Sequence, residues 1–198
     1  MTANPKSVPL RGRAPDAVKD LGRATVRTVG YASAALRMLP DFLIVGAQRC
    51  GTTSLFQALA AHPRVVPPLF HKGVHFFDTN AYQHGLRWYH AHFPIRAAAN
   101  RRAGGPAITG EASPYYLFHP AVPARMHALL PAAKLVVLLR DPVRRAYSHY
   151  WHERARGRET LEFEDAIAVE PQRIATAEAG LADGSIARSA DHQRFSYL

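Results

Sequence analysis

The sequence predicts an α/β fold, in which helices cover both faces of a central parallel sheet. The first observation is a pair of short apolar runs, at residues 42–45 and, after Lys134, within the strand predicted at 134–139, which are typical of strands buried on both faces. The second is that a helical pattern follows each run, and strands that alternate with helices form parallel sheets. The 198 residues are enough for one domain with a sizeable core.

The elements between and after these runs complete the pattern. Leu55 and Leu59 lie on one face of a helix that should end near residues 62–63. Asp141 can cap the helix after the second run, and Pro142 suits the first turn of that helix. Further strands are expected at 74–77 and, more weakly, at 107–111, and a further helix is expected at 120–130.

Basic residues dominate the charge of the chain. The formal net charge is +10, because 25 Lys and Arg residues outnumber 15 Asp and Glu residues. This balance favours polyanionic partners, such as phosphorylated cofactors, acidic glycans, nucleic acid or a membrane surface, although a general abundance of arginine would also produce it. Residues 1–40 contribute half of the net charge.

The charge asymmetry predicts a basic, partly disordered leader over 1–40 and a globular domain over 41–198. Within the leader, residues 17–38 are interpreted either as an amphipathic helix for a membrane surface or a partner, or as a solvated segment.

Cys50 is the single cysteine, so an intrachain disulfide is excluded. No apolar run approaches the ~18 residues of a membrane span, and no secretory signal is recognisable. A cytoplasmic protein, in peripheral membrane contact if the leader helix forms, is expected.

Ligands of parallel sheets bind beyond the carboxyl ends of the strands, where the sequence has its two most informative loops. The first loop has Gly46 and Gly51 at the spacing of the phosphate-binding P-loop, in which main-chain N–H groups and the following helix bind the anion. Thr52 stands where a nucleoside triphosphatase carries its lysine, and Arg49 supplies a cation inside the loop instead. A tight turn that binds no ligand is the alternative.

The second loop begins at Arg140 and enters the helix that Asp141 caps. Arg144 and Ser148 are four residues apart and therefore share a face of that helix. An arginine and a hydroxyl that converge near a helix start make a phosphate site, whereas an arginine-rich helix alone is more often a solvated face. Because both loops follow strands of one sheet, the sequence predicts a ligand with two separated phosphate groups.

Four blocks of the sequence resemble sulfotransferases that use 3′-phosphoadenylyl sulfate (PAPS) as donor. GAQRCGTTSL at 46–55 resembles their 5′-phosphosulfate loop, and VVLLRDPVRRAYSHY at 136–150 resembles their 3′-phosphate site. GVHFFD at 73–78 and GEASPYY at 110–116 resemble blocks of the heparan-sulfate-type and related bacterial enzymes. The resemblance covers about residues 41–170 and implies a P-loop-like fold in three layers. Family members continue with a loop that closes over the nucleotide, so the C-terminal part of the domain is expected to be missing.

The resemblance implies roles for individual residues. Arg49, where relatives often carry lysine, should bind the 5′-phosphosulfate and stabilise charge on the departing bridging oxygen. Arg140 and Ser148 should hold the 3′-phosphate, the group that distinguishes PAPS from ATP. The rest of the first loop should line the cofactor site with main-chain and hydroxyl donors or, for the cysteine, a small packing side chain: Cys50, Gly51, Thr52, Thr53 and Ser54. No metal is expected, because fixed cations and N–H groups neutralise the transferred group.

The acceptor must lose a proton, and the residue that takes it stays open at the level of the sequence. Heparan-type relatives carry a glutamate directly before the VHFF block, whereas this chain has Gly73. His75 is the first candidate base, because histidine titrates near neutrality, and Glu111 is the second. A packing role is the alternative for His75. Lys72 is adjacent and could bind the sulfuryl oxygens, and Ala112 stands where relatives often carry a further lysine.

Other functions have less support in the sequence. The missing lysine argues against a P-loop kinase or nucleoside triphosphatase, and a non-catalytic module that binds nucleotide or polyanion is a second alternative. His71 with His75, and His149 with His152, have helical metal-ligand spacings, but no third ligand accompanies either pair. The acceptor is expected to be a saccharide, a glycolipid or a small hydroxylated molecule, and nucleic acid is not an expected partner.

Overall fold

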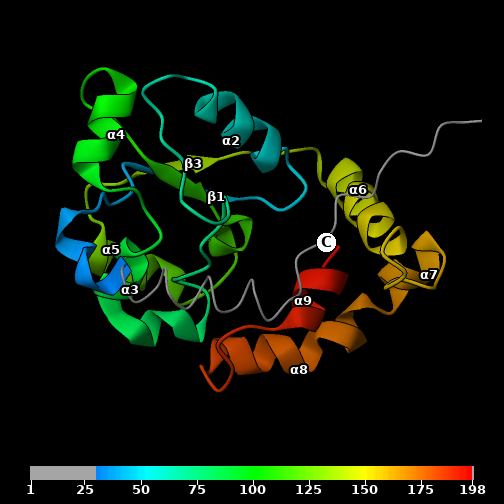
Figure 1. The fold of residues 1–198 in the computed structure, drawn as a ribbon. Helices are drawn as coiled ribbons and strands as arrows, with labels where there is room; N and C mark the ends of the chain where they lie inside the picture. Colours follow the sequence, from blue (N-terminus) through cyan, green and yellow to red (C-terminus); the bar gives the residue numbers. More distant parts are fainter. Residues whose placement is uncertain (1–29, 198) are drawn as a thin grey trace, which may run out of the picture.

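A computed structural model describes residues 30–197, which contain a parallel sheet of three strands. The strands are β1 (Phe42–Gly46), β2 (Gly110–Ala112) and β3 (Lys134–Val137), in the order β2-β1-β3 (Figure 1). The central strand β1 pairs in parallel with both of its neighbours. The loops that follow β1 and β3 therefore leave the same edge of the sheet from adjacent strands.

Helices precede, connect and follow the strands. Their bounds are η1 (Ala34–Leu36), α2 (Thr52–Ala60), η2 (Asn80–His84), α3 (Gly85–His90), α4 (Arg96–Ala103), η3 (Pro114–Leu117), α5 (Val122–Leu129), α6 (Pro142–Arg154), α7 (Phe163–Ala168), α8 (Glu170–Ala182) and α9 (Ala190–Phe195), where η denotes a 3-10 helix. The predicted helices after the first loop, at 120–130 and after Asp141 are confirmed as α2, α5 and α6. Asp141 is the N-cap of α6, and its Oδ1 accepts a hydrogen bond from the Arg144 amide at 2.9 Å.

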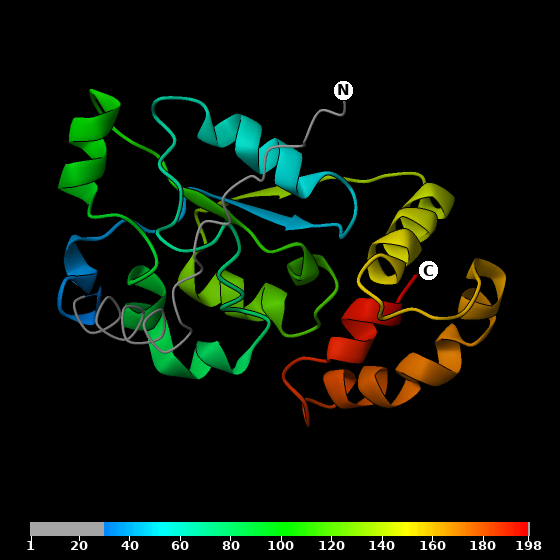
Figure 2. The ribbon, with the colours of Figure 1, turned by 45° about the vertical axis from the view of Figure 1, so that its right-hand side comes forward.

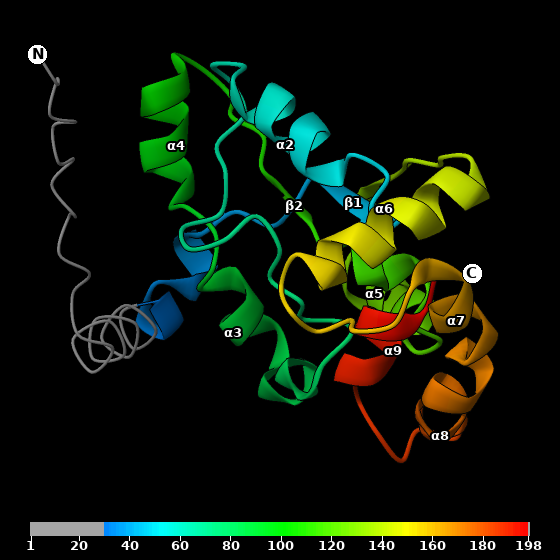
Figure 3. The same cartoon turned by 90° about the vertical axis from the view of Figure 1, so that its right-hand side faces the viewer.

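Successive side chains of β1 point to opposite faces of the sheet and build two cores. Phe42 and Ile44 pack with Phe56 of α2 on one face. Leu43 and Val45 join a larger cluster on the other face, which includes Met38, Phe76, Phe77, Tyr89, Phe93, Tyr116, Val122 and Met126. Figure 3 shows α2 on one side of the strands and α3 and α5 on the other. The predicted three-layer α/β architecture is therefore confirmed.

The helices α6 to α9 gather beyond the carboxyl end of the sheet (Figure 2). Their own core contains Ala146 and Tyr150 of α6, Ala166 of α7 and the buried Tyr197. Beside this core, Oε2 of Glu159 accepts hydrogen bonds from Arg173 at 2.6 Å and from the Tyr197 hydroxyl at 2.8 Å. Within this group, α6 and α9 contribute residues to the lining of the pocket described below.

The strand β3 is exposed, and the prediction that residues 134–139 are buried on both faces is wrong. Leu135 is 60% exposed, Val137 46% and Leu139 79%. The physical reason is position, because within residues 30–197 β3 pairs with β1 alone and lies at the end of the strand order. An end strand keeps apolar surface bare unless another element covers it. An apolar run therefore predicts a strand without predicting its place in the sheet.

Residues 74–77 form a loop, and the strand predicted there is wrong. His75 has a φ of 53°, in the left-handed region that extended strands do not use. The amides of Val74 and His75 bond to the side chains of Glu111 and Ser113 instead of to a neighbouring strand. The weaker prediction at 107–111 is confirmed only in part, because β2 begins at Gly110.

The predicted boundary between leader and domain differs from the structure. Met38 is completely buried, and Nη1 of Arg37 donates to the carbonyl of Phe93 at 2.6 Å, so the packed chain begins before Asp41. Most of the helix expected at 17–38, and the membrane contact expected of it, lie outside the described residues. Between residues 30 and 197, no helix is both long and apolar enough to cross a membrane.

Candidate active site

The loop after β1 presents main-chain N–H groups at the carboxyl edge of the sheet. Gly51 has a φ of 85° and Arg49 a φ of 66°, so both residues adopt the left-handed conformation. At Gly51 the φ value itself favours glycine, because a residue with a Cβ is strained in this conformation even though a Cβ there would meet no described atom within 4 Å. The chain then enters α2 at Thr52, and the start of a helix offers unpaired N–H groups and partial positive charge. This local geometry suits a bound anion.

Arg49 joins the two predicted phosphate loops. Its Nη1 lies 3.0 Å from Nδ1 of His152, and its Nη2 donates to Oγ of Ser148 at 3.5 Å. Its carbonyl oxygen accepts a hydrogen bond from Nη1 of Arg140 at 3.3 Å. Burial and the nearby charge of Arg156 lower the pKa of the Arg49 guanidinium. Several cations are thus held close together, an arrangement that a bound anion would stabilise.

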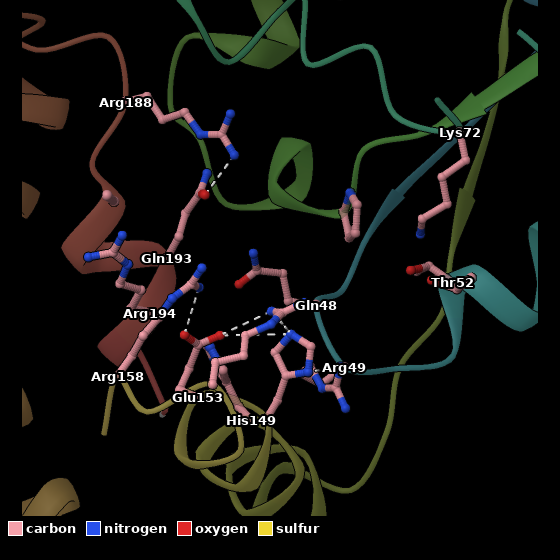
Figure 4. A pocket seen from close by; sticks show the side chains of 15 residues that line it. Gln48, Arg49, Thr52, Lys72, His149, Glu153, Arg158, Arg188, Gln193 and Arg194 are labelled. Atoms are coloured by element: carbon pink, nitrogen blue, oxygen red, sulfur yellow. Dashed lines mark hydrogen bonds and ion pairs between the residues drawn. The ribbon is translucent and has the colours of Figure 1, made fainter. Parts of the chain in front are cut away.

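A pocket of about 660 Å³ opens between this loop, α6 and α9 (Figure 4). Its lining consists of Gln48, Arg49, Thr52, Thr53, Lys72, Pro114, His149, His152, Glu153, Arg156, Arg158, Arg188, Ala190, Gln193 and Arg194. Six of these residues are Lys or Arg and one is acidic. Burial lowers the pKa of Lys72, and burial together with the Arg49 and Arg156 charges lowers the pKa of His152. The pocket is therefore suited to a ligand that carries several negative charges.

Three of the eight predicted cofactor residues, Arg49, Thr52 and Thr53, line this pocket. Lys72, which was predicted to bind the sulfuryl oxygens, lines it as well. The other predicted residues of the two loops and α6 belong to the same elements without lining the pocket: Cys50, Gly51, Ser54, Arg140 and Ser148. Arg140 and Ser148 both contact Arg49, which lines the pocket. The thiol of Cys50 lies 3.6 Å from the Gln48 carbonyl.

His75 lies on the loop after Lys72, outside the lining of the pocket. Its Nδ1 lies 2.9 Å from Oδ2 of Asp78, which is completely buried, whereas the His75 side chain is 31% exposed. Asp78 is an acceptor, so in the neutral imidazole this contact places the proton on Nδ1 and the lone pair on Nε2. A histidine oriented by a carboxylate in this way is arranged to take a proton at Nε2.

Glu111, the second candidate base, is completely buried. Its two oxygens accept four hydrogen bonds, from the hydroxyls of Tyr89, Ser113 and Tyr116 and from the Val74 amide. Burial raises the pKa of Glu111, and these four hydrogen bonds oppose the rise. With all of its acceptor positions occupied, this carboxylate has no oxygen that faces an acceptor substrate.

Gly73 is tightly enclosed by the same strand. A Cβ at this position would lie 2.7 Å from the Ala112 carbonyl oxygen and 3.4 Å from Nε2 of His75. A glutamate at position 73, which heparan-type relatives carry there, would therefore not fit in this chain unless the main chain moved. The geometry favours His75 over both carboxylates as the proton acceptor.

Sequence reasoning missed the far half of the pocket. On α6, Arg144, Ser148, His152 and the following Arg156 recur every four residues, a helical repeat that was legible in the sequence. Arg188 and Arg194 come from the region of α9, and no local pattern connects them with the loop after β1. His149 and His152 both line the pocket. Among residues 30–197, no three His, Cys, Asp or Glu side chains are grouped as metal ligands.

Comparison with known proteins identifies the family. The profile of the sulfotransferase domain matches residues 39–178. A bifunctional heparan sulfate N-deacetylase/N-sulfotransferase of Drosophila melanogaster is 40% identical over 129 residues, which cover 60% of this chain and 12% of that protein. The human N-deacetylase/N-sulfotransferase 2 is 39% identical over 123 residues, which cover 60% of this chain and 13% of that protein. The chain belongs to the sulfotransferase domain family, and it spans a small part of these curated relatives.

A solved structure supports the same assignment. The crystal structure of a sulfotransferase from Alicyclobacillus acidocaldarius aligns with a TM-score of 0.54 and 36% sequence identity. The alignment covers 73% of this chain and 62% of the bacterial one. The fold and family that the sequence blocks indicated are therefore confirmed.

Proposed function

We propose that this domain transfers a sulfuryl group from PAPS to a hydroxyl or amine of a saccharide. The observation that carries the proposal is the junction at Arg49, whose side chain meets Ser148 and whose carbonyl meets Arg140. A donor with a 5′-phosphosulfate and a 3′-phosphate needs two anion sites at a fixed separation, and this junction supports such a pair. Membership of the family and the names of the relatives support the same reaction.

In the proposed reaction, the 5′-phosphosulfate lies at the N-terminal end of α2. Thr52 and Thr53 donate hydrogen bonds there, together with main-chain groups of Cys50, Gly51 and Ser54. Arg49 stabilises the oxygen that bridges sulfur and phosphorus while its bond to sulfur breaks. Arg140 and Ser148 hold the 3′-phosphate. These hydrogen-bonding and cationic groups neutralise the negative charge of PAPS, and the fold already holds them close together.

The acceptor atom forms its new bond to sulfur as the bond from sulfur to the bridging oxygen breaks. The acceptor's proton passes to Nε2 of His75, because Asp78 occupies the other ring nitrogen. Lys72, on the same loop, binds the sulfuryl oxygens and offsets their charge in the transition state. The product 3′-phosphoadenosine 5′-phosphate (PAP) leaves with the negative charge that Arg49 stabilised.

The far end of the pocket supports an acidic saccharide as acceptor. Arg156 follows the last turn of α6 but lies close enough to Arg49 for its charge to lower the Arg49 pKa, so this cation belongs with the proposed donor site. Arg158, Arg188 and Arg194 line the same pocket, and neither proposed phosphate site uses these three cations. They are placed to bind carboxylate or sulfate groups of the acceptor.

A radiolabelled transfer assay tests the proposal. Wild-type protein is incubated with [35S]PAPS and with two oligosaccharides of equal length, one rich in uronic acid and one neutral. Label is expected on the acidic acceptor, and Arg158→Ala with Arg188→Ala should reduce that transfer while PAP binding is retained. PAP binding without transfer to either acceptor would indicate a non-catalytic binding module. Preference for ATP over PAP would indicate a kinase-like site and refute the donor assignment.

A further inference from the structure

Three successive main-chain amides in the loop that carries His75 bond to side chains from one short stretch of chain. The Val74 amide donates to Oε2 of Glu111 at 2.7 Å. The His75 amide donates to Oγ of Ser113 at 3.2 Å, and the Phe76 amide donates to the hydroxyl of Tyr116 at 2.9 Å. The segment 111–116 therefore takes the place of a neighbouring strand for this loop.

The two hydroxyls in this arrangement both depend on the same carboxylate. Oγ of Ser113 donates to Oε2 of Glu111 at 2.8 Å, and the hydroxyl of Tyr116 donates to Oε1 at 3.0 Å. Each hydroxyl thus accepts from a loop amide and donates to Glu111, so its own orientation is fixed from both sides. The hydroxyl of Tyr89 donates to Oε1 at 2.6 Å and completes the set without contacting a loop amide.

We propose that Glu111 is a positioning residue that sets the orientation of His75 by fixing the amides of residues 74–76. This inference rests on the proposed function, in which His75 accepts the proton. Glu111 reaches the Val74 amide directly, the His75 amide through Ser113 and the Phe76 amide through Tyr116. It is a buried support for the proton acceptor and does not itself touch the acceptor substrate.

The backbone of His75 shows why such a support is needed. Its φ of 53° is unfavourable for a residue with a Cβ and persists only where the surroundings impose it. In this conformation Nδ1 meets the buried Asp78, and Thr79 Oγ1 donates to the His75 carbonyl. The Ala112 amide also donates to the Lys72 carbonyl at 2.7 Å, so the segment that supports His75 supports Lys72 as well.

The chemistry of the network requires a carboxylate. Four donors converge on Glu111, and only an acceptor on both oxygens satisfies all of them. A glutamine would keep its oxygen toward Val74 and Ser113 and place its NH₂ group against the Tyr89 and Tyr116 hydroxyls. That arrangement disturbs the relay through Tyr116 while it preserves the volume of the side chain. Glu111→Gln is therefore a gentler and more specific change than Glu111→Ala, which would leave buried donors unpaired.

Amide hydrogen exchange tests the positioning directly and does not need turnover. Glu111→Gln is expected to speed exchange at Val74, His75 and Phe76 by about ten-fold or more, relative to amides of β1. Ser113→Ala should act mainly on His75 and serves as the second variant if Glu111→Gln fails to fold. Tyr89→Phe is the matched control, because it removes one hydrogen bond to the same carboxylate and should leave the three amides protected. Equal loss of protection in β1, or unchanged exchange at residues 74–76, would overturn the proposal.

A double-mutant cycle tests whether the positioning acts through His75. Glu111→Gln should lower kcat by roughly 10- to 100-fold and change the Kd for PAP by less than about two-fold. In a His75→Ala background the same change should have little further effect, because its target is already gone. Equal losses in both backgrounds would overturn the link to His75. If the wild-type protein transfers no sulfuryl group, the proposed function fails, and hydrogen exchange still decides whether Glu111 positions the loop.

Discussion

The substitution Arg140→Ala separates the two phosphate groups of the donor. Arg140 lies three residues beyond the exposed strand β3, and its Nη1 donates to the Arg49 carbonyl at 3.3 Å. If the Arg140 side chain holds the 3′-phosphate, its removal weakens the binding of ligands that carry this group and leaves the binding of other ligands unchanged. If it only stabilises the position of the Arg49 carbonyl, its removal weakens the binding of all ligands of the loop equally.

The exposure of Arg140 sets the size of the expected effect. Two unit charges at ~4 Å attract by about 1 kcal/mol in water and by about 4 kcal/mol near a protein surface of lower dielectric constant. An exposed residue at the edge of the site lies between these limits, so Arg140→Ala should weaken PAP binding by about 2 kcal/mol, or roughly 30-fold in Kd. The Kd of AMP, which lacks the 3′-phosphate, should rise by less than about three-fold.

Isothermal titration of the variant with PAP and with AMP measures the difference. Lys134→Ala is the matched control, because it removes the same unit of charge from an exposed residue at the other end of the strand, ~20 Å away. The control should bind both ligands with affinities within about two-fold of the wild-type values. Losses of equal size for PAP and AMP in Arg140→Ala would refute the 3′-phosphate assignment and leave the bracing role.

Three further substitutions address the remaining groups. Arg49→Ala should lower kcat more than it weakens PAP, because the bridging oxygen gains charge only in the transition state, and a rise in KM alone would contradict this role. His75→Ala should cost roughly 100-fold or more in kcat with PAP binding retained, and wild-type turnover in the variant would contradict the base assignment. Burial and Arg145 lower the pKa of His149 from 6.5 to about 4, so stability should be full above pH 6.5 and fall as the pH drops toward 4. His149→Gln should flatten the pH dependence of Tm in that window, and an unchanged slope would assign it to other groups.

The sequence was sufficient for the parts of the site that local patterns encode. The apolar run at 42–45, the glycine at position 51 and the Asp141 cap each report on their own neighbourhood, and the structure contains all three as expected. Parallel pairing then brings the two loops to one sheet edge. The adjacency of β1 and β3 was not legible, because strand order depends on crossover connections and not on local composition.

The errors share a cause, which is that burial and main-chain shape depend on neighbours distant in the sequence. Residues 74–77 were predicted to form a strand, but the hydroxyls and carboxylate of segment 111–116 stabilise a loop with a left-handed residue instead. Likewise, an apolar composition at 134–139 does not reveal whether a second strand or solvent lies beside it. Arg188 and Arg194 reach the pocket because α9 packs against α6 and contacts η3, where the Tyr115 hydroxyl lies 3.2 Å from Nδ1 of His192.

Two groups of buried charge in this molecule have opposite hydrogen-bonding states, and the contrast distinguishes a ligand site from a support. Around Glu111 every acceptor position is occupied, so the network fixes the protein's own main chain and leaves nothing for a ligand. Around Arg49 the reverse holds, because within the described chain its buried Nε has no hydrogen-bond partner and other guanidinium groups lie close by. Unpaired buried donors and clustered like charges raise the free energy of the unliganded state. An anion that binds at Arg49 removes both costs, whereas one that approached Glu111 would add to them. The contrast supports the proposal that the donor binds at the first group and that the second group supports the loop of His75.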